Sequence, residues 1–177
     1  MTDLVFGGFL EQQHEEGLAL SAASDLLDLE PEPADPPARY LARLRCEGLV
    51  RSPSGEIETA SHFMVGITFP DDYLRRVNPA EVLAWLGPPN VFHPNIIGMP
   101  PVICAGPISP GTPLVDLLYR VFEITTYQRL TMREDNALNH QACVWARQHQ
   151  DRFPIDARPL KRRLLDLTAP TPTEAAR

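Results

Sequence analysis

The sequence predicts an α+β fold, in which helices and antiparallel strands occupy separate stretches of the chain. Apolar residues recur at helical spacing over residues 9–29. Phe63, Val65, Ile67 and Phe69 instead recur at a period of two, which indicates a strand with one face in a core. Clear helical patterns return only after residue 112. Elements segregated in this way are typical of antiparallel α+β architectures.

The N-terminal part predicts one helix followed by a linker. Leucines and alanines recur at spacings of three, four and eight between glutamate-rich positions, so the helix is expected over residues 9–29. Residues 28–37 contain four prolines, which end a helix and predict an extended connection. We interpret this connection as a boundary between elements of one domain.

Three strands are expected next. The first spans residues 40–46 and continues toward Val50, the second spans residues 56–69, and the third spans residues 82–86. Residues 52–55 combine serine, proline and glycine, which is typical of a tight turn between the first two strands. The strands are therefore expected to form an antiparallel meander.

A proline-rich loop and further helices complete the predicted fold. Residues 87–110 hold too many prolines and glycines for a helix or a central strand, yet they are apolar enough to be fixed by packing. Pro113 suits the first turn of a second helix. A third helix is expected over residues 139–150, and a short amphipathic helix over residues 158–167.

Length and composition restrict the possible functions. The chain has 177 residues, of which 44% are hydrophobic and 22% charged, as in an ordinary globular protein. We expect residues 1–167 to form one domain and residues 168–177 to form a flexible tail. The net charge of −7 argues against nucleic acid as the main partner. No stretch approaches the roughly 20 apolar residues of a membrane span.

Cysteine usage predicts free thiols and no metal centre. Cys46, Cys104 and Cys143 are widely spaced, contain no Cys-x-x-Cys pair, and form no zinc-type spacing with the histidines. The N-terminus has no basic start and no apolar run long enough for a signal peptide. These observations indicate a reducing, cytoplasmic location. Cys46, on a strand, and Cys143, on a helix, are expected to be core residues.

The most informative motif is His93-Pro94-Asn95, which is followed nine residues later by Cys104. A thiol can act as the nucleophile in acyl transfer, and a neutral amide donor can stabilise the oxyanion that forms. Free cysteines are often buried core residues. However, a cysteine at the end of a loop rich in glycine and proline is a poor core candidate. The residues therefore favour a reactive thiol over a structural one at Cys104.

The motif resembles the signature of ubiquitin-conjugating enzymes, in which a His-Pro-Asn triplet precedes the acceptor cysteine by a similar distance. Residues 67–73 are similar to a strand end and turn of that family, and residues 90–96 are close to its consensus. Residues 135–142 resemble a later loop and helix start, so the likeness extends over residues 40–149. The resemblance implies the ubiquitin-conjugating fold: an N-terminal helix, an antiparallel β-meander, a cysteine-bearing loop and C-terminal helices.

Several positions depart from the family pattern. Ala105 and Gly106 replace the usual Leu-Asp after the cysteine, and the segment up to Ser109 is shorter than in typical eukaryotic members. Asn136 stands where an acid often flanks the cysteine. These departures indicate a divergent member. The Ala-, Arg-, Leu- and Pro-rich composition suggests a bacterial one, of the kind found with an activating-enzyme-like protein and a ubiquitin-like modifier.

The resemblance also implies a function and catalytic residues. Cys104 would accept a ubiquitin-like modifier as a thioester from an activating-enzyme-like protein, and would pass it to an amine on a target protein without a cofactor. Asn95 would donate its amide to the oxyanion or hold the loop through backbone groups. His93 would mainly organise the loop as a hydrogen-bond partner.

The same resemblance implies partner-binding and substrate-orienting roles for residues outside the motif. Ser109 and Pro110 are similar to a Ser-Pro pair on the surface loop that ligases use. Asp135 and Asn136 would orient or deprotonate the incoming lysine, or would simply belong to a solvated loop. The helix over residues 9–29 would form part of the surface that meets the activating enzyme.

Two other functions stay open at the level of the sequence. A catalytically silent binding module would hold a modifier or partner without forming a thioester, although silent relatives typically lack the cysteine that this chain retains. A cysteine hydrolase would use Cys104 with His93 as its base. That mechanism needs a third, orienting group and a separate oxyanion hole, and the sequence contains no recognisable candidate for either.

Overall fold

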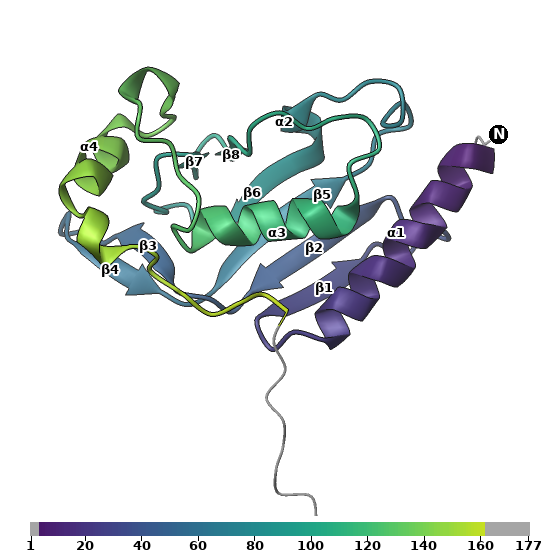
Figure 1. Cartoon of the computed structure of the whole chain (residues 1–177), viewed down its shortest axis with the longest axis horizontal. Coiled ribbons are helices and arrows are strands. Elements are labelled where there is room, and N and C mark those ends of the chain that lie inside the picture. Colours follow the sequence, from purple (N-terminus) through teal and green to yellow (C-terminus); the bar gives the residue numbers. More distant parts are fainter. Residues whose placement is uncertain (1–3, 162–177) are drawn as a thin grey trace, which may run out of the picture.

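The chain folds into an α+β structure, seen in a computed structural model that describes residues 4–161 (Figure 1). An N-terminal helix precedes an antiparallel sheet, and further helices follow the sheet, which confirms the fold class that the sequence predicts. The domain boundary expected at residue 167 and the tail expected over residues 168–177 lie outside the described residues.

A four-stranded antiparallel sheet forms the centre of the fold. Its strands, in spatial order, are β1 (Leu27–Pro31), β2 (Arg39–Leu44), β5 (Phe63–Thr68) and β6 (Leu83–Gly87). Alternate side chains of each strand are buried, so one face of the sheet carries the core. This alternation is the period of two that the sequence shows most clearly in β5.

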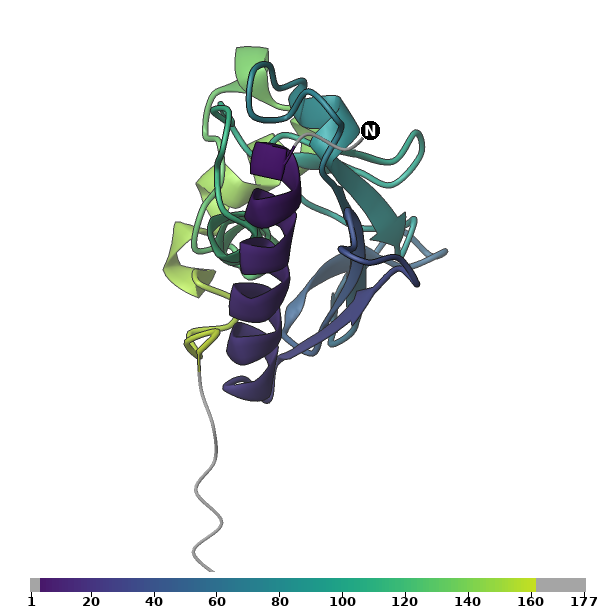
Figure 2. The same ribbon diagram turned by 90° about the vertical axis from the view of Figure 1, so that its right-hand side faces the viewer.

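Helices α1 (Leu4–Ala22) and α3 (Leu114–Thr125) lie on the same side of this sheet (Figures 1 and 2). Gly17 allows them to approach closely, because a Cβ there would lie 2.7 Å from Leu114 Cδ2. The buried Gln13 side chain accepts a hydrogen bond from the Leu114 N–H at 2.8 Å. Since Pro113 gives α3 no side-chain cap, α1 supplies an acceptor that the first turn of α3 needs.

The first helix lies earlier in the chain than the sequence predicts, since it begins at Leu4 rather than at residue 9. It ends at Ala22, and the leucines at 27 and 29 belong to β1, where both are buried. The Ser24 hydroxyl accepts a hydrogen bond from the Leu26 N–H at 3.1 Å, which offers the backbone a local alternative to the helix. The expected linker therefore begins inside a strand.

The strand expected over residues 40–50 and the strand expected over residues 56–69 each divide into two. β3 (Gly48–Arg51) and β4 (Ile57–Ala60) leave the main sheet and pair with each other as a separate hairpin. Gly48 lies against the end of α3, where a Cβ would stand 2.7 Å from the Thr125 carbonyl oxygen. Because this contact is long-range, the local sequence pattern does not reveal the break.

The β3–β4 hairpin and helix α4 (His140–Gln148) contribute to a second, smaller hydrophobic cluster. Its buried members are Leu49, Phe92, Tyr127, Ala142 and Ala146. Asn139 caps α4, since its Oδ1 accepts a hydrogen bond from the Ala142 N–H at 3.0 Å. The helix expected near residues 139–150 is thereby confirmed. This cluster supports the segment that precedes the Cys104 loop.

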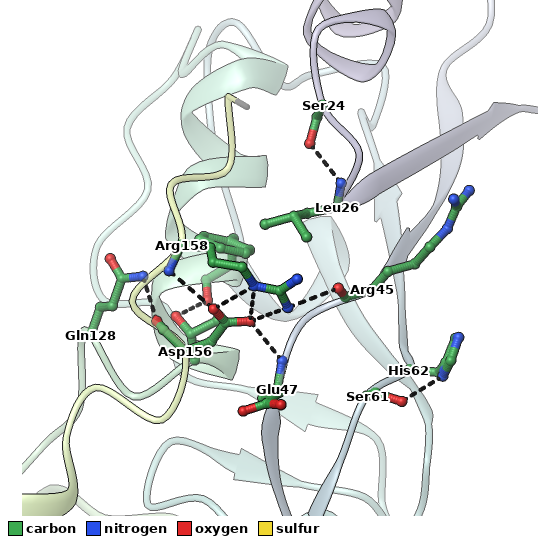
Figure 3. Close-up of polar contacts among 11 residues, drawn as sticks. Ser24, Leu26, Arg45, Glu47, Ser61, His62, Gln128, Asp156 and Arg158 are labelled. Carbon is green, nitrogen blue, oxygen red and sulfur yellow. Dashed lines mark hydrogen bonds and ion pairs between the residues drawn. The ribbon is translucent and has the colours of Figure 1, made fainter. Parts of the chain in front are cut away.

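Residues 153–161 run back from α4 toward the end of α1 (Figures 1 and 3). The buried carboxylate of Asp156 accepts hydrogen bonds from the Glu47 N–H at 2.9 Å and from the backbone and guanidinium of Arg158. Burial acts to raise the pKa of Asp156, but these donors outweigh it and lower the pKa to about 2. The carboxylate therefore fastens this segment to the turn between β2 and β3.

The prediction of a helix over residues 158–167 is wrong for residues 158–161, the part that the structure describes. Residues 158–161 are not helical, because Arg158 is engaged by Asp156 and the Leu160 carbonyl accepts a hydrogen bond from Ser24 at 2.5 Å. Residues 162–167 lie outside the described part of the chain.

The remaining helical segments within residues 4–161 are short: α2 (Pro79–Val82) precedes β6, and the 3-10 turns Glu134–Asn136 and Gln150–Arg152 lie on either side of α4. Within residues 4–161, no helix is both long and apolar enough to cross a bilayer.

Candidate active site

The three cysteine thiols of the chain differ in exposure. Cys46, just after β2, and Cys143, within α4, are fully buried. Burial raises the pKa of both thiols, to about 12 at Cys46. Cys104 is partly exposed, so it is the one thiol that a reagent or substrate can reach without opening the fold.

A small hairpin sets the position of Cys104. Strands β7 (Ile96–Ile97) and β8 (Val102–Ile103) pair antiparallel directly before the cysteine. Gly98 begins the turn between them, and a Cβ there would overlap the Pro89 carbonyl oxygen, so a larger residue cannot enter without moving backbone. The hairpin returns the chain to its start, which places Cys104 beside Asn95.

Asn95 and Cys104 are joined by two hydrogen bonds. The Cys104 N–H donates to the Asn95 carbonyl at 2.8 Å, and Asn95 Nδ2 donates to the Cys104 carbonyl at 3.0 Å. A side-chain amide nitrogen carries two hydrogens, so one N–H is left beside the cysteine. The arrangement is compatible with both roles that the sequence leaves open for Asn95, holding the loop and donating to an oxyanion.

The triplet also ties the Cys104 loop to the segment after α3. Asn95 Oδ1 accepts a hydrogen bond from the Thr131 N–H at 2.8 Å. The Pro94 carbonyl accepts from the N–H groups of Leu138 and Asn139 at 2.9 and 3.2 Å. Three stretches that are distant in sequence therefore meet at the triplet.

His93 is buried and holds the loop by hydrogen bonding. Its Nδ1 accepts from the Asn95 N–H at 3.0 Å, so the neutral ring carries its proton on Nε2. The ring packs edge-on against Tyr127, with 4.3 Å between ring centroids, and the Tyr127 hydroxyl donates to the Phe92 carbonyl. Burial lowers the pKa of His93 to about 3. A ring with its acceptor nitrogen occupied and so low a pKa is poorly suited to act as a base for Cys104.

Cys104 opens into a cleft of about 380 Å³ between its own loop and the segment that follows α3. Asn95, Thr131 and Asn136 line this cleft together with Cys104. Gly106, two residues after the cysteine, is exposed and has a φ of 78°, a conformation that favours glycine. Ala105, Ile124 and Leu130 also line the cleft, so its wall is partly polar and partly apolar next to a reachable thiol.

Other expected site residues lie apart from this cleft. Asp135 is fully exposed and forms a two-pronged ion pair with Arg133, at 2.6 and 3.1 Å, which lowers the pKa of its carboxyl. It does not line the cleft, whereas its neighbour Asn136 does. Ser109 and Pro110 form an exposed turn before α3, in which the Ser109 carbonyl accepts from the Thr112 N–H and hydroxyl.

Two residues of the cleft carry no signal in the sequence. Thr131 contributes its backbone N–H, which any residue but proline would supply. Arg129 lines the cleft from the segment after α3, but in the sequence nothing distinguishes it from the other arginines. Both positions become recognisable only when the triplet and this segment are brought together.

No group of three or more metal-ligating side chains occurs among residues 4–161. Neither the family models nor the curated proteins against which the chain was compared include a match. Any functional conclusion must therefore rest on the chemistry of the cleft. A reachable thiol with a neutral amide donor beside it can accept an acyl group and release it to a second nucleophile.

Proposed function

We propose that this chain is a ubiquitin-conjugating-like transferase that carries a ubiquitin-like modifier as a thioester on Cys104. The observation that carries the proposal is the pair of hydrogen bonds between Asn95 and Cys104, at 2.8 and 3.0 Å. These bonds hold the one partly exposed thiol of the chain next to an amide donor, at the edge of a cleft. The chemistry of such a pair suits acyl transfer.

The order of elements supports the same proposal. A helix, an antiparallel sheet, a loop bearing the cysteine and then helices is the order that the ubiquitin-conjugating fold would have. We assign the chain to that fold on this order and on the motif at residues 93–104. Its partners would then be an activating-enzyme-like protein, the modifier and a target protein. Three unpaired cysteines fit a reducing, cytoplasmic setting.

The transfer has two steps. In the first, the Cys104 thiolate attacks the thioester carbonyl of the charged activating enzyme; a new C–S bond forms, the donor's C–S bond breaks, and the donor's cysteine leaves as thiolate. In the second, an amine nitrogen attacks the Cys104 thioester, the C–N bond forms, the C–S bond breaks, and Cys104 leaves as thiolate. The amine gives up its proton to water. Asn95 would donate its second N–H to the oxyanion in each step.

The test uses tagged full-length protein in an ATP-supplied lysate of the cells that make it. Wild type should acquire a protein adduct that thiol reductant removes, whereas Cys104→Ser should acquire one that resists reductant, because it is an ester. Cys104→Ala should acquire neither. Mass spectrometry of the Cys104→Ser adduct should place the modifier's C-terminal residue on residue 104.

The same experiment separates the alternatives. Lack of any adduct on wild type and on Cys104→Ser would overturn the transferase and leave the silent binding module. A hydrolase with His93 as base would instead release free modifier without passing it to an amine. The occupied Nδ1 and the low pKa of His93 argue against that mechanism.

A further inference from the structure

The charge of the Cys104 cleft limits which acceptors can enter it. Arg129 is the only described residue lining the cleft that has a charged side chain. The carboxylates of the adjoining 3-10 turn are engaged elsewhere, since Asp135 pairs with Arg133 and Glu134 pairs with Arg147 at 2.5 Å. A lysine ammonium approaching Cys104 therefore meets a positive group, with no carboxylate in the cleft wall to attract it.

Arg129 is free to bind a carboxylate that an acceptor brings. Within residues 4–161 its one ion pair is with Glu123, at 3.9 Å, and the side chains of Arg129 and Glu123 are 54% and 39% exposed. An exposed pair at that separation contributes little and is readily exchanged. A planar guanidinium binds a carboxylate through two parallel hydrogen bonds, which is a stronger and more directional contact.

We propose that Arg129 is a specificity-determining residue, and that the preferred acceptor is a lysine with an acidic side chain beside it in sequence. This inference rests on the proposed function, because it concerns the second transfer step. The carboxylate binds Arg129, and the neighbouring Nζ, after losing a proton to water, attacks the Cys104 thioester. The C–N bond forms as the C–S bond breaks, Cys104 leaves as thiolate, and the nitrogen gives its second proton to water.

The test requires neither the natural modifier nor the activating enzyme. Full-length protein is charged on Cys104 with a short synthetic peptide carrying a C-terminal thioester, and the excess peptide is removed. The charged protein is then offered one of two acceptor peptides of equal length. Each acceptor has a single lysine, flanked by glutamates in one peptide and by glutamines in the other. Loss of the Cys104 thioester is followed by intact mass.

At low acceptor concentration, the glutamate-flanked acceptor should discharge the Cys104 thioester of wild type about tenfold faster than the glutamine-flanked acceptor does. This is the effect expected for one charge-assisted contact at a half-exposed site. Arg129→Gln should abolish the preference, and Arg129→Glu should reverse it. Arg39→Gln, which removes an exposed arginine at the start of β2, outside the cleft, should keep the preference. Reaction of both acceptors with a free small-molecule thioester corrects for their intrinsic reactivity.

The outcomes distinguish this inference from the proposed function. If both acceptors remove the acyl group from charged Cys104 at equal rates, the role of Arg129 is overturned and the transferase stands. The same holds if the preference for the glutamate-flanked acceptor survives Arg129→Gln. If charged Cys104 loses its acyl group only to water with either acceptor, the transfer to amines itself falls, and the inference falls with it.

Discussion

Asn95 and Cys104 hold each other in place: the backbone N–H of the cysteine donates to the Asn95 carbonyl, and the Asn95 amide donates to the Cys104 carbonyl. The same amide accepts from the Thr131 N–H through Oδ1. One side chain therefore positions the thiol, fixes the opposite wall of the cleft, and keeps a second N–H for chemistry.

The acceptor role of Asn95 can be separated from its donor roles by substitution. Asn95→Ala leaves the Thr131 N–H without its acceptor, so the free energy of unfolding should fall by about 1–3 kcal/mol. Discharge of a Cys104 thioester to an amine should slow by about 100-fold. Asn95→Asp keeps an acceptor for Thr131 but has no N–H to donate, so it should recover part of the stability and none of the rate.

The measurements are urea unfolding and thioester discharge by intact mass. Asn90→Asp, at an exposed amide outside the cleft, controls for the general effect of a new carboxylate. If the Cys104 thioester of Asn95→Asp is discharged at the wild-type rate, the amide only holds the loop.

Exposure predicts that the three cysteines react at different rates. With iodoacetamide at neutral pH, Cys104 should be alkylated first. Cys46 and Cys143 should react more slowly by a factor of about 100 or more, because each is fully buried and must wait for the fold to open. Peptide mass spectrometry over time measures the three rates. Cys104→Ser should lose the fast phase alone; a fast phase that persists would mean that another thiol is reachable.

Some of this structure could be predicted because its cause is local. The alternation in β5 is decided by residues a few positions apart, and the strand occurs where that pattern predicts it; likewise, α3 begins directly after Pro113. The leucines at 26–29 fit a helix and a strand equally. Periodicity therefore does not mark the end of the helix. The feature found there is the hydrogen bond that the Ser24 hydroxyl accepts from the Leu26 N–H.

The remainder depends on contacts between distant residues. The separate strand β3 begins at Gly48, where Thr125, 77 positions later, occupies the space that a side chain would need. The motif at residues 93–104 identified the thiol and its amide, but Thr131 and Arg129 reach the cleft from the segment after α3. No local pattern marks such pairs, so the sequence indicates the thiol, its neighbouring amide and Asn136, but not Thr131 or Arg129.

Asp156 should contribute to stability far more than an exposed ion pair of the same shape. Asp156→Asn removes a carboxylate whose side chain is 3% exposed and bound by Arg158 and the Glu47 N–H. Because Arg158 is 40% exposed and can return to water, we expect a loss of about 2 kcal/mol rather than the larger cost of a fully buried pair.

Asp135→Asn is the matched control for Asp156→Asn, since its carboxylate also pairs with an arginine two residues away but is fully exposed. This control should leave the urea midpoint nearly unchanged. Equal shifts for the two variants would contradict the role given to burial at Asp156.

His93 should make the fold less stable as the pH falls below neutral. Its pKa is about 3 in the folded chain, compared with about 6.5 in an unfolded one. Below pH 6.5 the unfolded chain therefore binds a proton that the folded chain does not bind. The free energy of unfolding should then decrease by about 1.4 kcal/mol for each pH unit, from this residue alone.

The test of this pH dependence compares wild type with His93→Gln, which lacks the titrating ring but retains an oxygen that can accept from the Asn95 N–H. Urea unfolding between pH 7 and about pH 4.5 avoids the range in which Asp156 is protonated in the unfolded chain. His93→Gln should be less stable than wild type at pH 7, and this difference should shrink as the pH falls, because only wild type has the His93 penalty. His62→Gln, at an exposed histidine, should follow wild type throughout. A constant difference between wild type and His93→Gln would mean that His93 is protonated within the fold.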